Sequence, residues 1–218
     1  MLWVGQFGII DGQPREDSPW VGVFAESDRA DPEEATDLFV LVEPARPESE
    51  DACRELASTI GAKFRERRLS LSGGILRGLE AAHEELREWN RKSLKEHRAG
   101  AGVSCLALRG GACYLGQVAP AACVILRAGT VVRLAPELPD AAEPLGLHEE
   151  FWPDLSQHEL SEGDRLLLLS PGLSEALSDE ELGEALALEP DETLPALYRK
   201  AKGLDRCAAL LVALLETR

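Results

Sequence analysis

The stretch that decides the expected fold is SEGDRLLLLSPGLSEALSDEEL, residues 161–182. Gly163-Asp164 predicts a turn, and the following apolar run to Leu169 has the length of a strand buried on both faces. Ser170-Pro171-Gly172 predicts a sharp break, because proline lacks an N–H donor and glycine tolerates unusual φ angles. Ser178 is a good helix N-cap, with Glu181 at the capping-box position. The stretch therefore predicts a strand, a tight turn and an acidic helix start.

Upstream of this stretch the pattern is strands, then helices. Between Trp3 and Phe24, apolar runs on both sides of the polar segment 11–19 predict two strands joined by a loop. Residues 38–42 predict a buried strand that ends in the turn 43–47. Apolar residues at three- and four-residue spacing predict a helix over about 48–67 and a longer one from the glycines at 73–74 to about His97. The apolar stripe of the longer helix is Ile75, Leu79, Ala82, Leu86 and Trp89.

The rest of the chain predicts antiparallel strands and a final block of helix and strand. Residues 103–118 and 123–134 each predict a hairpin around a short glycine-containing turn, and 135–160 predict a loop. A helix over 193–202 and a strand over 208–214 follow. Because strands and helices occur in blocks, we expect one α+β domain over residues 1–218, with helices outside antiparallel sheets.

Charge and cysteine usage limit the functions that fit. The net charge is −16, and residues 135–198 hold 17 acids and one base. Such a surface repels nucleic acid and anionic membrane, so it is either a solvated face or a site for a basic protein partner. No apolar run approaches the roughly 18 residues of a membrane span, and no basic signal-peptide start is present. The five cysteines lie in apolar runs without a C-x-x-C pair, which predicts buried thiols in a reducing, cytoplasmic compartment.

The segment GDRLLLLSPGL, with the order of predicted elements, resembles the PPM family of metal-dependent Ser/Thr phosphatases. The resemblance implies a four-layer αββα sandwich and two Mg²⁺ or Mn²⁺ ions that activate water against phosphoserine or phosphothreonine. Family members carry a metal-binding Asp after the Ser or Thr of this segment. Pro171 stands at that position here, so a ligand carboxylate is absent.

Three other family motifs can be compared with this sequence. The family's N-E-D matches Arg15-Glu16-Asp17, its A-D-G matches Val42-Glu43-Pro44, and its D-N matches Asp205-Arg206. The polar family segment V-G-D-S-R-A-Y reads V-A-P-A-A-C-V at 118–124. The resemblance thus leaves Asp17, Glu43 and Asp205 as candidate metal ligands, with Glu16 beside them, and no confident catalytic residue.

Three functions stay open on the sequence. The first is an impaired phosphatase domain, a pseudophosphatase, that acts by binding a protein partner such as a phosphoprotein or a kinase. No cofactor is expected in that case. The second is a weak phosphatase in which Asp17, Glu43 and Asp205 hold a Mn²⁺ or Mg²⁺ ion. The third is a scaffold subunit with an acidic surface.

Overall fold

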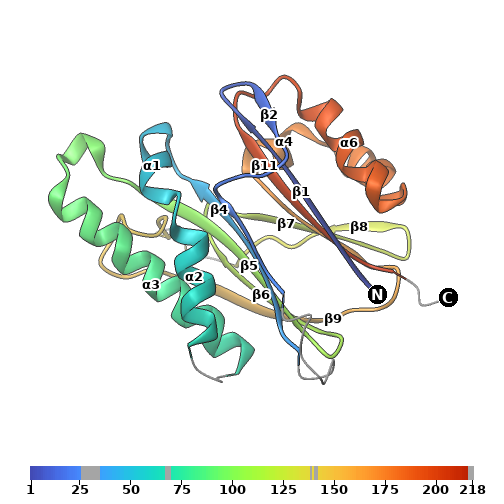
Figure 1. The fold of residues 1–218 in the computed structure, drawn as a ribbon, viewed down its shortest axis with the longest axis horizontal. Helices are drawn as coiled ribbons and strands as arrows, with labels where there is room; N and C mark the ends of the chain where they lie inside the picture. The colour runs from blue at the N-terminus through green and yellow to red at the C-terminus, as the bar shows by residue number, and fades with distance from the viewer. Residues whose placement is uncertain (26–34, 67–69, 138, 140–141, 216–218) are drawn as a thin grey trace. The chain divides into compact units, whose positions relative to one another are not determined.

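The computed structural model describes all residues except 26–34, 67–69, 138, 140–141 and 216–218 (Figure 1). Its contacts divide the chain into two compact units. Unit 1 comprises Met1–Ser18, Ala122–Ala135 and Leu160–Arg218, and unit 2 comprises Pro19–Ala121 and Pro136–Glu159. Each unit contains one antiparallel sheet flanked by helices, so the predicted α+β class is confirmed. The expectation of a single domain stays a prediction.

The sheet of unit 2 has five strands in the order β3-β4-β5-β6-β9. The strands are β3 (Val21–Phe24), β4 (Asp37–Pro44), β5 (Ala101–Arg109), β6 (Ala112–Val118) and β9 (Asp154–Glu159). The helical segments are η1 (Pro47–Ser49), α1 (Glu50–Cys53), α2 (Leu56–Arg65), α3 (Leu71–Lys92) and η2 (Lys95–His97).

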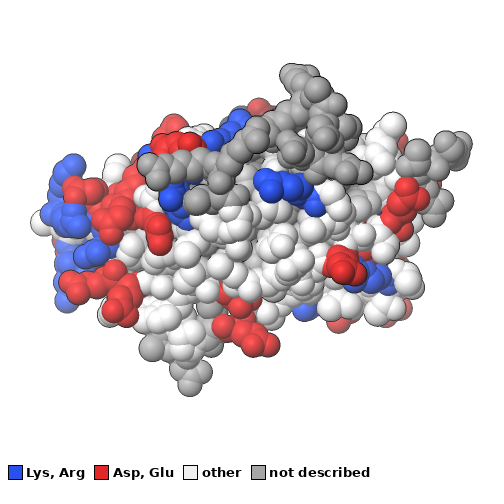
Figure 2. Space-filling model, turned by 90° about the horizontal axis from the view of Figure 1, so that it is seen from below, with Lys and Arg blue, Asp and Glu red and all other residues white. Residues whose placement is uncertain are grey.

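The long helices of unit 2 cover one face of its sheet, with α2 against β3 and β4 and α3 against β5 and β6. Ser70 begins α3, because its side chain accepts a hydrogen bond from the Gly73 N–H. Figure 2 shows Lys and Arg interleaved with Asp and Glu at its left end, where the C-terminal end of α3 lies.

The sheet of unit 1 has six strands in the order β2-β1-β11-β10-β7-β8. The strands are β1 (Leu2–Ile10), β2 (Gln13–Arg15), β7 (Ala122–Arg127), β8 (Thr130–Arg133), β10 (Arg165–Leu169) and β11 (Cys207–Leu214). The helices are α4 (Pro171–Ala176), α5 (Asp179–Ala187) and α6 (Pro190–Ala201).

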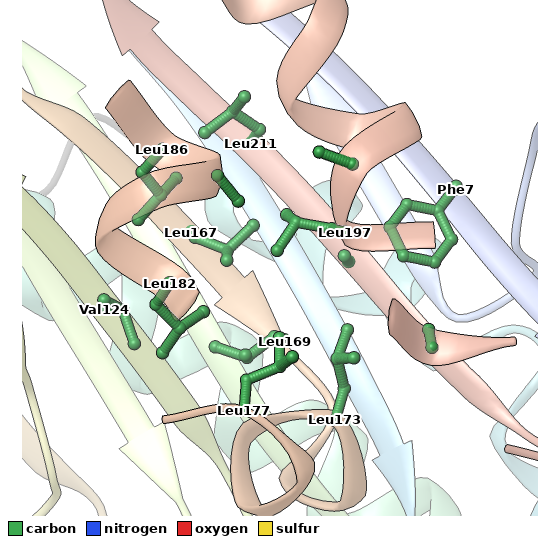
Figure 3. Close-up of a cluster of buried hydrophobic side chains, with 14 of the residues drawn as sticks. Phe7, Val124, Leu167, Leu169, Leu173, Leu177, Leu182, Leu186, Leu197 and Leu211 are labelled. Carbon is green, nitrogen blue, oxygen red and sulfur yellow. The ribbon is translucent and has the colours of Figure 1, made fainter. Parts of the chain in front are cut away.

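The three helices of unit 1 pack on one face of this sheet through leucines (Figure 3). Alternate residues of β10 and β11, such as Leu167, Leu169 and Leu211, meet Leu182 and Leu197 from α5 and α6. Side chains alternate between the two faces along a strand, so only every second residue faces the helices. On β1, Phe7 is one of the residues that face them. The apolar run 165–169 is therefore a central strand, as predicted.

Two polar networks hold the helices of unit 1 to one another and to the sheet. Ser178 and Glu181 form the predicted capping box at the start of α5. Hydrogen bonds from Lys200 and Ser178 lower the pKa of Glu181 to about 2. The Arg133 side chain of β8 donates to Asp179 Oδ1 and to the carbonyl oxygens of Ser174 and Leu177. These bonds fix the connection between α4 and α5.

Several sequence predictions need correction. The predicted loop 11–19 contains β2, because Asp11 and Gly12 both adopt positive φ and make a tight two-residue turn. The helix expected over 48–67 is broken into η1, α1 and α2. The longer helix ends at Lys92 rather than His97, and its Trp89 is 46% exposed rather than buried.

Two further elements were missed. The predicted loop 135–160 contains β9, an edge strand whose residues alternate between half-buried and exposed. The predicted tight turn after Ser170 is the start of α4, because proline is well suited to the first turn of a helix. The prediction of buried thiols is confirmed, since all five cysteines are buried and none is in a disulfide. No helix among the described residues is long and apolar enough to cross a membrane.

Candidate functional site

In unit 1, strand pairing brings the segments containing Asp17 and Asp205 to the same end of the sheet. Strand β1 lies between β2 and β11, with Gly8 opposite both Arg15 and Ala208. The Gly12 N–H donates a hydrogen bond of 2.9 Å to the Asp205 carbonyl oxygen. Residues 15–17 therefore lie close to the start of β11.

Pro171 is fixed at the same end by the buried residue before it. The Ser170 N–H donates to the Ala208 carbonyl oxygen at 2.9 Å, and the Ser170 hydroxyl accepts from the Ala208 N–H at 2.8 Å. Ser170 thereby continues the pairing of β10 with β11 and directs the chain into α4, whose first residue is Pro171. Proline suits the first turn of a helix, because the N–H group that it lacks would have no partner within the helix there. Pro171 therefore has a structural role as the first residue of α4, although it supplies no metal ligand.

Three of the four compared motifs are thus brought together within unit 1. Asp17, Glu16 and Asp205 are exposed, and Pro171 is half-buried. Arg15 and Arg206 stand where the resemblance expects asparagine, next in sequence to Glu16 and Asp205.

The fourth motif lies in unit 2, at the end of β4. Glu43 is half-buried and pairs with Gly102 of β5, and Pro44 is buried. Gly102 in turn lies against the backbone of Pro120, in the apolar segment 118–124. A Cβ atom on residue 102 would lie 1.6 Å from the Pro120 carbonyl oxygen, so only glycine fits there.

The residues of this end of unit 1 do not fit a two-metal centre. Mg²⁺ and Mn²⁺ require several oxygen ligands, mostly carboxylates and water. Pro171 removes one carboxylate, and arginines stand at positions 15 and 206, where the resemblance expects uncharged asparagine. Among the described residues, no group of three or more His, Cys, Asp or Glu side chains is placed to hold a metal ion. We derive no reaction step through a metal.

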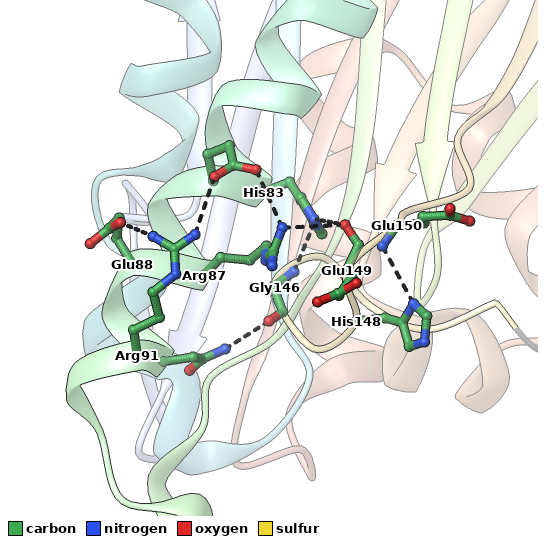
Figure 4. A network of polar contacts seen from close by, with 10 residues as sticks. His83, Arg87, Glu88, Arg91, Gly146, His148, Glu149 and Glu150 are labelled. Carbon is green, nitrogen blue, oxygen red and sulfur yellow. Dashed lines mark hydrogen bonds and ion pairs between the residues drawn. The ribbon is translucent and has the colours of Figure 1, made fainter.

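A second polar site, which the sequence did not indicate, lies in unit 2 between α3 and residues 146–149 (Figure 4). Asn90 donates to the carbonyl oxygens of Ala99 and Gly146 and accepts from the Ala99 N–H. His83 accepts from the Gly146 N–H at 3.1 Å through Nδ1, and its Nε2 lies 3.3 Å from the Glu149 carbonyl oxygen. Two buried side chains of α3 therefore hold this loop, in which Gly146 has a φ of 85°.

These contacts require a neutral His83. Because Nδ1 accepts a hydrogen bond, the ring proton is on Nε2, and a second proton would break the bond from Gly146. Burial lowers the pKa of His83 below its ordinary value, and the hydrogen bond to Glu149 only partly opposes this effect.

The stability of the protein is expected to depend on pH through His83. With the folded pKa below the unfolded value of about 6.5, the unfolded chain binds the proton more readily. The contribution of His83 is therefore fully present above about pH 6.5 and is lost as the pH falls through the folded pKa. Between pH 7.5 and 5.5, the free energy of unfolding should fall more steeply in the wild type than in His83→Gln, by at most about 1.4 kcal/mol per pH unit.

Chemical denaturation of both proteins at each pH checks this expectation. The neighbouring charges of Glu84, Arg87 and His148 are present in both, so the difference isolates His83. Parallel curves for the two proteins would show that His83 does not titrate differently on folding.

Comparison with solved structures establishes the fold class. The chain has the fold of the PPM-type Ser/Thr phosphatases, as the sequence resemblance predicted. The serine/threonine phosphatase of S. agalactiae superposes with a TM-score of 0.80 at 20% identity, covering 99% of this chain and 100% of that chain.

Two other solved structures show the same likeness. PppA, a regulatory component of T6SS in Pseudomonas aeruginosa, gives a TM-score of 0.75 at 17% identity, with 97% of each chain covered. The PstP catalytic domain in complex with two manganese ions gives 0.71 at 16% identity, covering 99% of this chain and 100% of that chain. No protein-family model and no curated protein matches the sequence.

Proposed function

We propose that this chain is a pseudophosphatase, a PPM-fold domain that binds a protein partner without hydrolysing phosphate esters. The observation that carries the proposal is Pro171 at the first position of α4, next to β11, where the resemblance expects a metal-binding carboxylate. Loss of a residue that only hydrogen-bonds to a metal ligand typically lowers metal affinity or activity by about 10–100-fold. Loss of an anionic residue that binds the metal itself is expected to lower them more.

The charges that remain at this end of unit 1 favour binding over catalysis. Arg15 and Arg206 present guanidinium groups, which form paired hydrogen bonds to a phosphoryl group. A bound phosphoserine or phosphothreonine would be held there without an ion to polarise it or to activate water. The preferred partner is therefore a phosphoprotein, or a kinase that carries a phosphorylated segment.

The cellular setting follows from the cysteines. Five buried thiols outside any disulfide fit a reducing compartment, so we place the protein and its signalling role in the cytoplasm. This placement is part of the proposal.

Binding of a phosphopeptide tests the proposal. A fluorescent peptide with one phosphoserine should bind the wild type and stay phosphorylated, while its unphosphorylated form should bind at least about tenfold more weakly. The double variant Arg15→Gln/Arg206→Gln should weaken binding of the phosphorylated peptide to this end of unit 1. The control Arg199→Gln/Lys202→Gln, with the same change of charge on or just after α6, should leave it unchanged. Equal binding of both peptides to the wild type would reject a phosphoprotein partner at this site.

An alternative is a weak Mn²⁺- or Mg²⁺-dependent phosphatase. It is favoured by the carboxylates kept at Asp17, Glu43 and Asp205, since water can complete the ligand shell of a hard ion. Metal-dependent turnover separates the two functions.

A further inference from the structure

A pocket of about 290 Å³ lies at the C-terminal end of α3, entirely within unit 2. It is lined by the last turns of α3, by Arg98 and by the loop 146–149. The hydrogen bonds of Asn90 and His83 to this loop form its rigid frame. The volume is just below the range for small-molecule pockets, about 300–1,000 Å³. A small group, or the end of one side chain, fits it better than a nucleotide.

The charge of the lining is opposite to that of the protein. Three arginines, Arg87, Arg91 and Arg98, line the pocket with one acidic residue, Glu149, in a chain of net charge −16. The Glu149 backbone carbonyl accepts from Arg87 at 3.4 Å (Figure 4). The pocket lining therefore has more positive than negative side chains, although Glu84 and Glu88 lie close to Arg87 and Arg91.

The ion pairs of these arginines leave them able to bind a ligand. Glu84 lies 3.6 Å from Arg87 and 3.9 Å from Arg91, and its side chain is 60% exposed. Arg91 also pairs with Glu88, and both side chains are 53% exposed. Exposed pairs of this kind contribute only about 0–1 kcal/mol. Arg98 is exposed and is in no ion pair among the described residues.

We propose that this pocket binds a dianionic phosphate group through Arg87, Arg91 and Arg98. Guanidinium groups present forked donors that match a phosphate oxygen pair, and several of them together favour a dianion over a carboxylate. The group comes either as a free phosphate or as the phosphorylated side chain of a protein. This inference does not rest on the proposed function, because it uses no residue of unit 1.

Nuclear magnetic resonance titration of the ¹⁵N-labelled full chain tests the site. The probes are inorganic phosphate, a phosphoserine peptide and the same peptide with glutamate, at pH 7.5, where a phosphate monoester with a second pKa of about 6 is mostly dianionic. The amide signals of residues 146–149 should shift on saturable binding of a phosphate probe. The glutamate peptide should bind at least about tenfold more weakly than the phosphoserine peptide.

Matched variants locate the binding. Arg91→Gln/Arg98→Gln should weaken it by at least about tenfold, whereas Arg46→Gln/Arg54→Gln, with the same change of charge on exposed residues of unit 2, should leave it unchanged. The shifts should also persist in Arg15→Gln/Arg206→Gln, which separates this site from that of the proposed function. Tighter binding of the peptide than of inorganic phosphate identifies a phosphorylated protein as the source, and the reverse order identifies free phosphate.

Three outcomes would overturn the proposal. They are no shift at 146–149 with either phosphate probe, equal affinity for the glutamate peptide, and unchanged binding in the folded Arg91→Gln/Arg98→Gln variant.

Discussion

Gly102→Ala is expected to destabilise the protein by at least about 3 kcal/mol, among the largest effects of any single methyl group added to this chain. Gly102 lies in β5 between β4 and β6, opposite Glu43. Its new Cβ atom would lie 1.6 Å from the Pro120 carbonyl oxygen and 2.4 Å from the Pro120 carbonyl carbon. Both are backbone atoms, so no side-chain rotation relieves the overlap. Either the segment at Pro120 or strand β5 must move.

Gly172→Ala is the matched control for this prediction. Gly172 lies in α4, where the added methyl group would meet no atom within 4 Å beyond the neighbouring backbone of the helix itself, and alanine is the better helix former by about 1 kcal/mol. Urea denaturation of both variants gives their free energies of unfolding. A Gly102→Ala protein within 1 kcal/mol of the wild type, as a rough bound for a tolerated core change, would show that the backbone near Pro120 yields easily.

Asp164→Ala is expected to cost about 1–3 kcal/mol, the range for leaving a buried hydrogen-bonding group without its partner. The Asp164 side chain is 3% exposed, and its Oδ2 accepts from Arg127 Nη2 at 2.7 Å. The same carboxylate accepts from the Ser161 N–H at 2.9 Å. The alanine variant would leave that N–H without its carboxylate acceptor. It would also leave the half-exposed Arg127 without this counter-ion, at the entry to β10.

Asp51→Ala gives the comparison for an exposed pair. Asp51 accepts from Arg54 at 3.1 Å with its side chain 80% exposed, so the change should cost less than about 1 kcal/mol. Thermal and urea unfolding of both variants should separate the two positions clearly. If Asp164→Ala were no more destabilised than Asp51→Ala, the Arg127 pair would be structurally unimportant.

The parts of the fold that were predicted correctly depend on local signals. The run 165–169 has five residues of strand length between turn residues, and it forms a central strand. Ser178 and Glu181 satisfy helix N–H groups wherever a helix starts, so their spacing alone identified α5.

The elements that were missed depend on their neighbours. Strand β9 has the polar sequence DLSQHE, and only its pairing with β6 makes it a strand. Trp89 has the spacing of the buried stripe, yet the stripe passes through His83 and Asn90, which are buried because they hydrogen-bond to the loop at Gly146. Apolar spacing carries no information about such partners.

The sequence identified the candidate residues, but it could not show which of them lie together in the fold. The pairing of β1 with β2 and β11 brings the segments of Asp17 and Asp205 together, although they are far apart in the chain. The arginine pocket at α3 was missed because residues 146–149 carried no motif and read as a plain loop.

Hydrolysis of an aryl phosphate in millimolar Mn²⁺ tests the central claim most directly, beside an Asp205→Asn control. We expect no turnover above the buffer rate from folded wild-type protein, because Pro171 removes a carboxylate and arginines stand at positions 15 and 206, where the resemblance expects uncharged asparagine. Turnover that requires Mn²⁺ and disappears in Asp205→Asn would contradict the account, and it would establish a working metal site in this chain.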